Sequence, residues 1–327
     1  MTEKTSRQTA SVSDSSAASA PAADPRRHGD QVFRWTATGA GILILVVLAL
    51  VAGFLLLQGA PALFADPAEL VAKGYGEFAS WVLPYAFGTV WAAVLALLMA
   101  VPVSIGIALF ISHYAPRRLA QPLGYVIDLL AAVPSVVFGL WGSLLLAPAV
   151  RDFYQWLNDH LGFIPLFSGQ VSGTGRTILT AAIVLATMVL PIVTSLTREV
   201  FLQAPRLHEE AALALGATKW EMVKMAVLPF ARPGIIAAVM LGLGRALGET
   251  MAVAMVMSGG RNITFEVLTS DNPNTIAATI AQGFPEAFGL KTNQLIAAGL
   301  VLFLITLVVN MIARWIVARR AEYSGAN

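Results

Sequence analysis

Six long apolar stretches restrict the fold of this chain more than any other feature. Each is long enough to cross about 30 Å of hydrocarbon as a helix. Backbone polar groups in lipid must find partners within the protein, so isolated apolar stretches of this length span a membrane as helices. The predicted spans are 37–58, 85–112, 122–148, 177–201, 233–257 and 293–317. The expected fold is therefore an all-α polytopic membrane protein with six transmembrane helices.

The composition agrees with a membrane protein. The 327 residues are 57% hydrophobic and only 12% charged, whereas soluble domains carry about 25% charged residues. No cysteine is present, which excludes disulfide bonds and thiol catalysis. The four histidines lack the spacing of a zinc site, so we expect no metal or cofactor in this chain. Residues 1–34 are poor in large apolar side chains and are expected to form a disordered tail.

Basic residues are sorted between the two ends of the predicted spans. Lys and Arg number 15 in the two termini and in the second and fourth connections, against 5 in the other three connections. Cytoplasmic segments carry an excess of Lys and Arg. Both termini and the long loop 198–232 are therefore expected in the cytoplasm.

The fifth predicted span contains two charged residues, Arg245 and Glu249. A charge at bilayer depth costs about 3 kcal/mol on insertion scales, so it is retained where it is paired or used. The i, i+4 spacing places both groups on one helix face, where an Arg fork beside a carboxylate could hold an oxyanion. Thr250 could add a hydroxyl, although it could equally bond its own helix. The two charges could instead form a structural ion pair or pair with a partner subunit. Gly244 and Gly248 form a small-xxx-small pair that would let another helix approach.

The loop between the fourth and fifth spans has the pattern of two short helices. Pro205 can open the first helix, and Gly216 stands where a left-handed residue would end it. Thr218 and Glu221 match a capping box that would start the second helix, expected to end at Pro229. The alternative is an ordinary amphipathic connector.

This loop resembles the EAA loop of binding-protein-dependent ABC importer permeases. The likeness consists of Glu210-Ala211-Ala212, then Gly216 three residues later, and Leu228-Pro229 at the end, with Ala226 where the family usually has Ile. Two further segments resemble permeases of the phosphate-specific (Pst) importer, closer to the C-type (PstC-like) than to the A-type. They are Leu-Ala-Ala-Val-Pro-Ser-Val-Val-Phe-Gly-Leu-Trp-Gly at 130–142 and Gly-Leu-Gly-Arg-Ala-Leu-Gly-Glu-Thr-Met-Ala-Val at 242–253.

The resemblance covers about residues 80–318, and it implies the type I ABC importer (MetI-like) permease fold and a role in phosphate import. It assigns 81–318 to the permease domain, with a coupling elbow at 205–229 in which Glu210, Ala211 and Gly216 contact the ATPase. The implied partners are an A-type permease (PstA-like), an ATPase dimer (PstB-like) that uses ATP, and an extracytoplasmic phosphate-binding protein (PstS-like). The first span with its outer loop (35–80) and the end 319–327 lie outside the likeness. Import of another oxyanion remains an alternative.

An enzymatic role finds little support in the sequence. The chain has no Gly-x4-Gly-Lys-Ser/Thr and no Gly-x-Ser-x-Gly motif, so it carries neither a P-loop nor a nucleophile elbow. A secondary carrier that acts alone is the surviving rival, but such carriers often contain internal repeats, and none is evident. An ATPase partner would explain the elbow, whereas a carrier would need none.

Three further groups have more than one interpretation. Asp128 in the third span is expected to pair with an arginine such as Arg198, with a transport role as the alternative. His113 and the two following arginines at 117–118 are expected to anchor the membrane interface. Aromatic residues of the third connection, on the outer side, are expected either at the level of the lipid headgroups or in contact with a binding protein: Tyr154, Trp156, Phe163 and Phe167.

Overall fold

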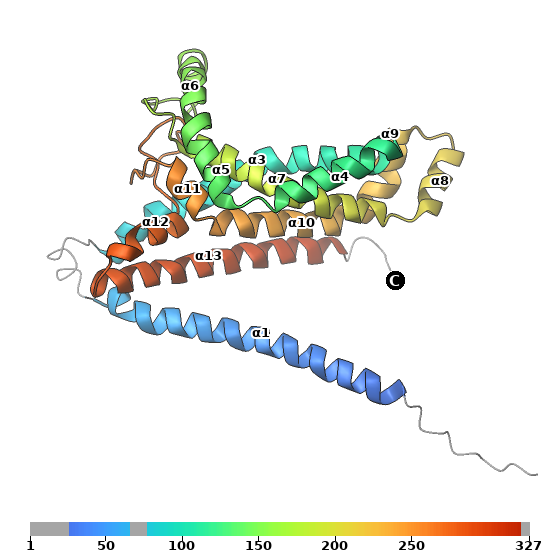
Figure 1. Ribbon diagram of the computed structural model, residues 1–327, viewed down its shortest axis with the longest axis horizontal. Coiled ribbons are helices and arrows are strands. Elements are labelled where there is room, and N and C mark those ends of the chain that lie inside the picture. Colours follow the sequence, from blue (N-terminus) through green and yellow to red (C-terminus); the bar gives the residue numbers. More distant parts are fainter. Residues whose placement is uncertain (1–25, 66–76, 322–327) are drawn as a thin grey trace, which may run out of the picture. The chain divides into compact units, whose positions relative to one another are not determined.

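The computed structural model describes residues 26–65 and 77–321, with side chains described for 29–65 and 77–315. This part of the chain consists of helices and loops, with a single isolated bridge between Gly260 and Pro273 and no named strand (Figure 1). The α-helices are α1 Arg26–Leu63, α3 Phe78–Leu109, α4 Arg117–Ala131, α5 Ser135–Trp141, α6 Ala147–Leu161, α7 Ile178–Leu202, α8 Arg206–Ala214, α9 Lys219–Met222, α10 Leu228–Gly248, α11 Met251–Val256, α12 Ile276–Gly283 and α13 Leu290–Ala321.

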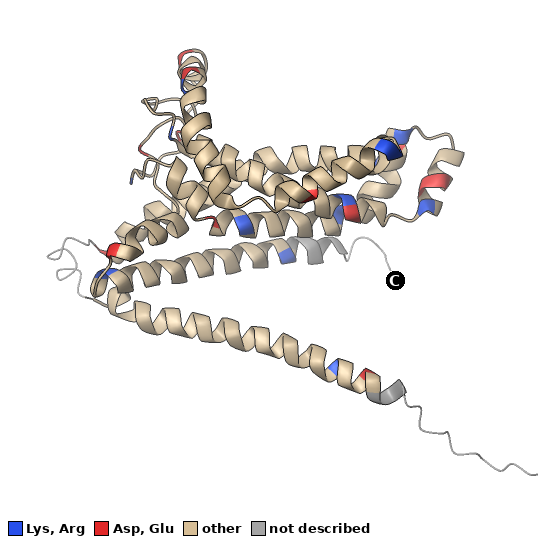
Figure 2. Ribbon diagram, viewed as in Figure 1, with Lys and Arg blue, Asp and Glu red and all other residues tan. Residues whose placement is uncertain are grey.

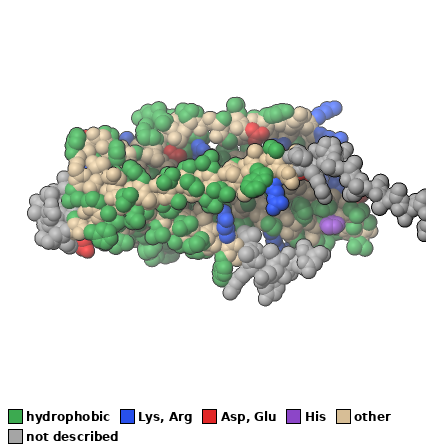
Figure 3. All heavy atoms as spheres, turned by 90° about the horizontal axis from the view of Figure 1, so that it is seen from below, with side chains coloured by type: hydrophobic (Ala, Val, Ile, Leu, Met, Phe, Trp, Pro, Cys, Tyr) green, Lys and Arg blue, Asp and Glu red, His purple; other side chains and the backbone are tan. Residues whose placement is uncertain are grey.

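Six helices of the described residues are long and apolar enough to cross a membrane, which confirms the predicted number of spans. They comprise Gly29–Leu63, Phe78–Tyr114, Ser135–Leu161, Ile178–Leu202, Lys219–Gly248 and Leu290–Trp315. The face shown in Figure 3 carries mainly hydrophobic side chains, as a surface in contact with lipid requires. Helix α1 begins at Arg26, so the expected tail 1–34 extends too far, and residues 1–25 lie outside the described part.

The chain divides into two units, residues 1–51 and 52–327. In the first unit, the described part of α1 has apolar side chains that are almost all exposed, which suits a helix surrounded by lipid. In the second unit, α7 packs along α3, and α10 packs against α7. Helix α3 supplies small residues to this contact, including Ala92, Ala96 and Ala100, which are almost fully buried. Such small side chains let membrane helices approach closely.

The predicted third span, 122–148, has the wrong limits. Helix α4 ends at Ala131, and a new helix starts at Ser135 and runs to Leu161. Pro134 at the N-cap has extended backbone angles (φ −60°, ψ 139°). A proline cannot donate the hydrogen bond that would continue α4, so it separates the two helices. The apolar residues on both sides of Pro134 hid this break from a count of hydrophobicity.

The prediction that the second helix of the elbow ends at Pro229 is also wrong. Helix α9 continues through a π-helical segment, Val223–Val227, into α10, and Lys219–Gly248 forms one span. The N–H of Leu228 donates to the carbonyl of Val223, five residues earlier. This wide turn leaves Pro229 in the first turn of α10, where a missing N–H is tolerated.

Candidate functional site

Arg245 lies in the last turn of α10 and lines a cavity of about 650 Å³. The cavity is bounded by residues of three helices, α7, α10 and α13: Ile192, Ala237, Met240, Leu241, Gly244, Arg245 and Asn310. The Nε atom of Arg245 is buried and has no hydrogen-bond partner among the described residues. A guanidinium stays charged in any environment, so an arginine that lines an open cavity without an ion-pair partner in the described part is suited to binding an anion.

Glu249 does not lie on the same helix face as Arg245, contrary to the prediction from their spacing. Helix α10 ends at Gly248, and Glu249 has an extended backbone (φ −67°, ψ 128°). Its side chain is buried, and Oε1 accepts a hydrogen bond of 3.3 Å from the N–H of Ala252. No ion pair joins Arg245 to Glu249 in the described part. The structural ion pair that was the alternative is therefore wrong within this chain.

The helix break is stabilised by side chains that bond the local backbone. The Thr250 hydroxyl donates to the carbonyl of Gly248 at 3.0 Å, and Glu249 accepts from the start of α11. Such local bonds compete with helical hydrogen bonds. Thr250 thus bonds its own backbone, as the alternative interpretation proposed. The substrate-path roles of Glu249 and Thr250 stay predictions.

Gly244 and Gly248 have nothing of the described chain within 4 Å of a Cβ built on either residue. The predicted approach of another helix at this pair therefore finds no partner in the described part of this chain. Helix α10 instead has close contacts with α7 at Gly234 and at Gly242, where a Cβ would come within 2.7 Å of Val189 and 2.8 Å of Val193. Sequence reasoning overlooked Gly242 because its role depends on α7, which is distant in the sequence.

The predicted elbow between α7 and α10 is present. Gly216 has a φ of +85°, and the N–H groups of Gly216 and Ala217 donate to Leu213 and Ala212 at 3.0 and 3.2 Å. This is the Schellman arrangement that ends a helix at a left-handed residue. The Thr218–Glu221 capping box then starts α9 with both of its hydrogen bonds formed.

The outer surface of the elbow is apolar as well as charged. Helix α8 has no buried residue, and Glu210 and Ala211 are exposed. Large apolar side chains of the elbow are also exposed: Leu207, Leu213, Leu215 and Trp220. Charged residues gather at the same end of the second unit (Figure 2). An exposed apolar surface with a polar rim is typical of a protein interface.

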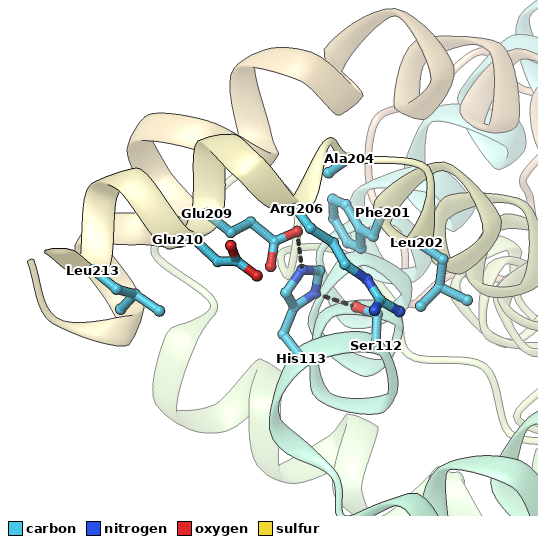
Figure 4. Close-up of a pocket in the computed structure, with 9 residues that line it drawn as sticks. All are labelled: Ser112, His113, Phe201, Leu202, Ala204, Arg206, Glu209, Glu210 and Leu213. Atoms are coloured by element: carbon cyan, nitrogen blue, oxygen red, sulfur yellow. Dashed lines mark hydrogen bonds and ion pairs between the residues drawn. The ribbon is translucent and has the colours of Figure 1, made fainter.

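The His113 side chain contacts the elbow, while its predicted role, with residues 117–118, as an anchor at the membrane interface stays a prediction. Its Nε2 lies 3.7 Å from Oε1 of Glu209, and its Nδ1 lies 2.7 Å from Oγ of Ser112 (Figure 4). The ring packs edge-on against Phe201 at 6.2 Å between centroids, and only 10% of the His113 side chain is exposed. The contact joins the end of the second span to α8. The position of His113 directly after an apolar span gave no indication of it.

Asp128 and Tyr154 also differ from expectation. Asp128 accepts a hydrogen bond of 2.8 Å from Ser195, and no ion pair to Arg198 exists in the described part. Tyr154 is fully buried, with its hydroxyl 2.9 Å from that of Thr180, so it belongs to the core rather than to a headgroup layer. Trp156 remains exposed and stacks on two neighbours in α6.

Comparison with known proteins agrees with this architecture. The family model "Binding-protein-dependent transport system inner membrane component" matches residues 100–322. The phosphate transport system permease protein PstC 2 of Mycobacterium tuberculosis is 47% identical over 300 residues, covering 89% of this chain and 92% of that protein. PstC of Mycobacterium leprae is 45% identical over 306 residues, covering 90% and 95%.

A solved structure shares the fold. It belongs to a bacterial ABC transporter involved in the import of the acidic polysaccharide alginate, with a TM-score of 0.58 and 17% identity, covering 90% of this chain and 99% of that one. The model match, the relatives and the six helices lead to one conclusion. The chain belongs to the family of binding-protein-dependent transport system inner membrane components, the permeases of ABC importers.

Proposed function

We propose that this chain forms half of the path by which an ATP-driven importer moves inorganic phosphate into the cell. The observation that carries the proposal is the guanidinium of Arg245, which lines the cavity and has no ion-pair partner among the described residues. A guanidinium offers a planar fork to two phosphate oxygens. The names of the relatives, which are phosphate permeases, support phosphate as the anion.

The proposed complex contains this chain, an A-type permease, two ATPase copies and an extracytoplasmic phosphate-binding protein. The exposed apolar side chains on α8 and after it support docking of the ATPase at the elbow, with Glu210 and Ala211 in the contact. The charge distribution supports an orientation in which the elbow and both termini are cytoplasmic. Phosphate would be handed over at the opposite side, where the loops 162–177 and 257–275 join through backbone hydrogen bonds such as Ser172 N–H to Leu268 at 2.9 Å.

Glu249 has a supporting role in this proposal. Its buried carboxylate accepts a hydrogen bond from the N–H of Ala252 in the first turn of α11, and α10 stops at Gly248, three residues after Arg245. Broken helices whose ends meet a substrate recur in membrane transporters. The carboxylate would thus help to set the position at which the anion binds, while Arg245 supplies the positive charge.

The test is phosphate uptake by the assembled complex in proteoliposomes. Arg245→Gln removes both the charge and the planar fork of donors, and phosphate uptake is expected to fall at least 100-fold. Arg245→Lys keeps the charge, so its uptake should fall by a smaller factor. Glu249→Gln keeps an acceptor oxygen for the Ala252 N–H and should lose less than Arg245→Gln. The amount of assembled complex is measured for each variant. An assembled Arg245→Gln complex that imports at the parental rate would contradict the proposal.

A further inference from the structure

Asn310 is an amide in the middle of an apolar transmembrane helix. From Leu295 to Ala313 of α13, only Thr306 and Asn310 carry polar side chains. The Thr306 hydroxyl donates to the carbonyl of Phe303 at 2.8 Å, so it is satisfied within the helix. The Asn310 amide is exposed and makes no hydrogen bond to the described residues. An amide without partners is unfavourable in lipid, so this side chain belongs against protein or water.

The polar residues of this part of α13 share one face. Thr306, Asn310 and Arg314 follow one another at intervals of four residues, which stacks them along one side of a helix. Leu304 and Met311, which lie elsewhere around the helix, are exposed apolar residues suited to lipid. The face with Asn310 is therefore the polar one in this part of α13.

Asn310 and Arg245 border the same cavity from two different helices. They bring complementary chemistry to it, because the guanidinium is a permanent cation and the amide is a neutral group with two donors and an acceptor. The unpaired donors on both sides of the cavity are arranged as the lining of a binding site rather than as a contact between α10 and α13.

We propose that Asn310 is a second substrate-binding residue, which holds the phosphate against Arg245. The inference rests on the proposed function of Arg245. The amide N–H groups donate to ionised oxygens, and the amide carbonyl accepts from a protonated phosphate oxygen. A neutral group adds contacts without adding charge, and a transport path needs binding that is weak enough to release its ion.

The first test uses the absence of native cysteine. Asn310→Cys and Met311→Cys place single thiols at the same depth, both at exposed positions, but only residue 310 borders the cavity. In the assembled importer, a negatively charged aqueous thiol reagent should modify Asn310→Cys at least tenfold faster, and phosphate with ATP should slow that reaction. Equal rates at the two positions, or no effect of phosphate, would overturn the inference.

The second test measures uptake by assembled complexes of three variants. Asn310→Leu should lower uptake about tenfold, the factor expected for one hydrogen bond to a charged group. Asn310→Gln should retain more uptake than Asn310→Leu, because it keeps the amide. Asn310→Asp should retain the least uptake, because a carboxylate repels the anion. The amount of assembled complex is measured for each variant, because a carboxylate at bilayer depth also disfavours assembly where the residue only packs.

Arg245→Gln in the same preparation separates the two proposals. If Arg245→Gln is inactive while Asn310→Leu and Asn310→Asp import at the parental rate, the assignment of Asn310 is wrong and that of Arg245 stands. If Arg245→Gln itself imports normally, the proposed function of this site fails, whatever the Asn310 variants do.

Discussion

Replacing Gly216 by valine isolates the backbone geometry of the elbow. The residue has a φ of +85°, and nothing in the described part of the chain lies within 4 Å of a Cβ built there. The substitution therefore introduces no clash, and its cost is the left-handed conformation alone. That conformation costs an L-residue about 1–2 kcal/mol, with a β-branched residue at the upper end.

This penalty corresponds to a 5- to 30-fold shift in a local equilibrium, taking about 1–2 kcal/mol as the range. Helix α8 has no buried residue, so the elbow can open without unfolding the spans. Opening breaks the hydrogen bonds from Gly216 and Ala217 to α8. Amide exchange there should accelerate by a factor within that range in Gly216→Val, and less in Gly216→Ala.

Gly216→Asn is the matched control, because asparagine tolerates the left-handed region. Amide exchange is measured by mass spectrometry on the peptide that contains residues 212–218, and ATP hydrolysis stimulated by the binding protein is measured on the same complexes. Stimulation of ATP hydrolysis should be highest in Gly216→Asn, lower in Gly216→Ala and lowest in Gly216→Val. Parental exchange in the valine variant, or equal exchange in the asparagine and valine variants, would refute the reasoning from φ.

Two other predictions address packing and orientation. Gly142→Ala would place a Cβ 2.6 Å from a valine methyl of α7, so the assembled complex should lose about 1–3 kcal/mol of stability by overpacking. Gly106→Ala is the control, because nothing in the described part of the chain lies within 4 Å of its Cβ. Equal melting temperatures for the two variants would contradict the packing argument. Single cysteines replacing Asp159, Ser13 and Ser324 test the orientation. An impermeant thiol reagent added to intact cells should label position 159 and neither of the other two. Labelling of a terminus would disprove the six-span topology.

The spans and the elbow could be predicted because their signals are local. Length and hydrophobicity fix a transmembrane helix, and Gly216 followed by the Thr218–Glu221 box specifies a turn within a few residues. The error at Pro134 arose from giving hydrophobicity more weight than a known helix breaker. The error at Pro229 arose because a π-helical segment has no sequence signature as clear as that of the proline it accommodates.

The site was less accessible to sequence reasoning. The prediction for Glu249 assumed that α10 continues past Gly248, since the residues after it are as apolar as those before it. The break depends on bonds from Glu249 and Thr250 to backbone groups that become available only once the helix has stopped. Asn310 was overlooked because its importance comes from a cavity shared with Arg245, 65 positions earlier in the sequence.

The uninterrupted span from Lys219 to Gly248 has a mechanical consequence. The 26 residue steps from Lys219 to Arg245 correspond to about 39 Å at a rise of about 1.5 Å per residue. A rod of that length converts a tilt of about 5° at one end into a displacement of about 3 Å at the other. If the ATPase docks at the elbow and the anion binds beside Arg245, as proposed, a movement of the elbow would reach the cavity through one helix, which contains the π-helical segment Val223–Val227 but no loop.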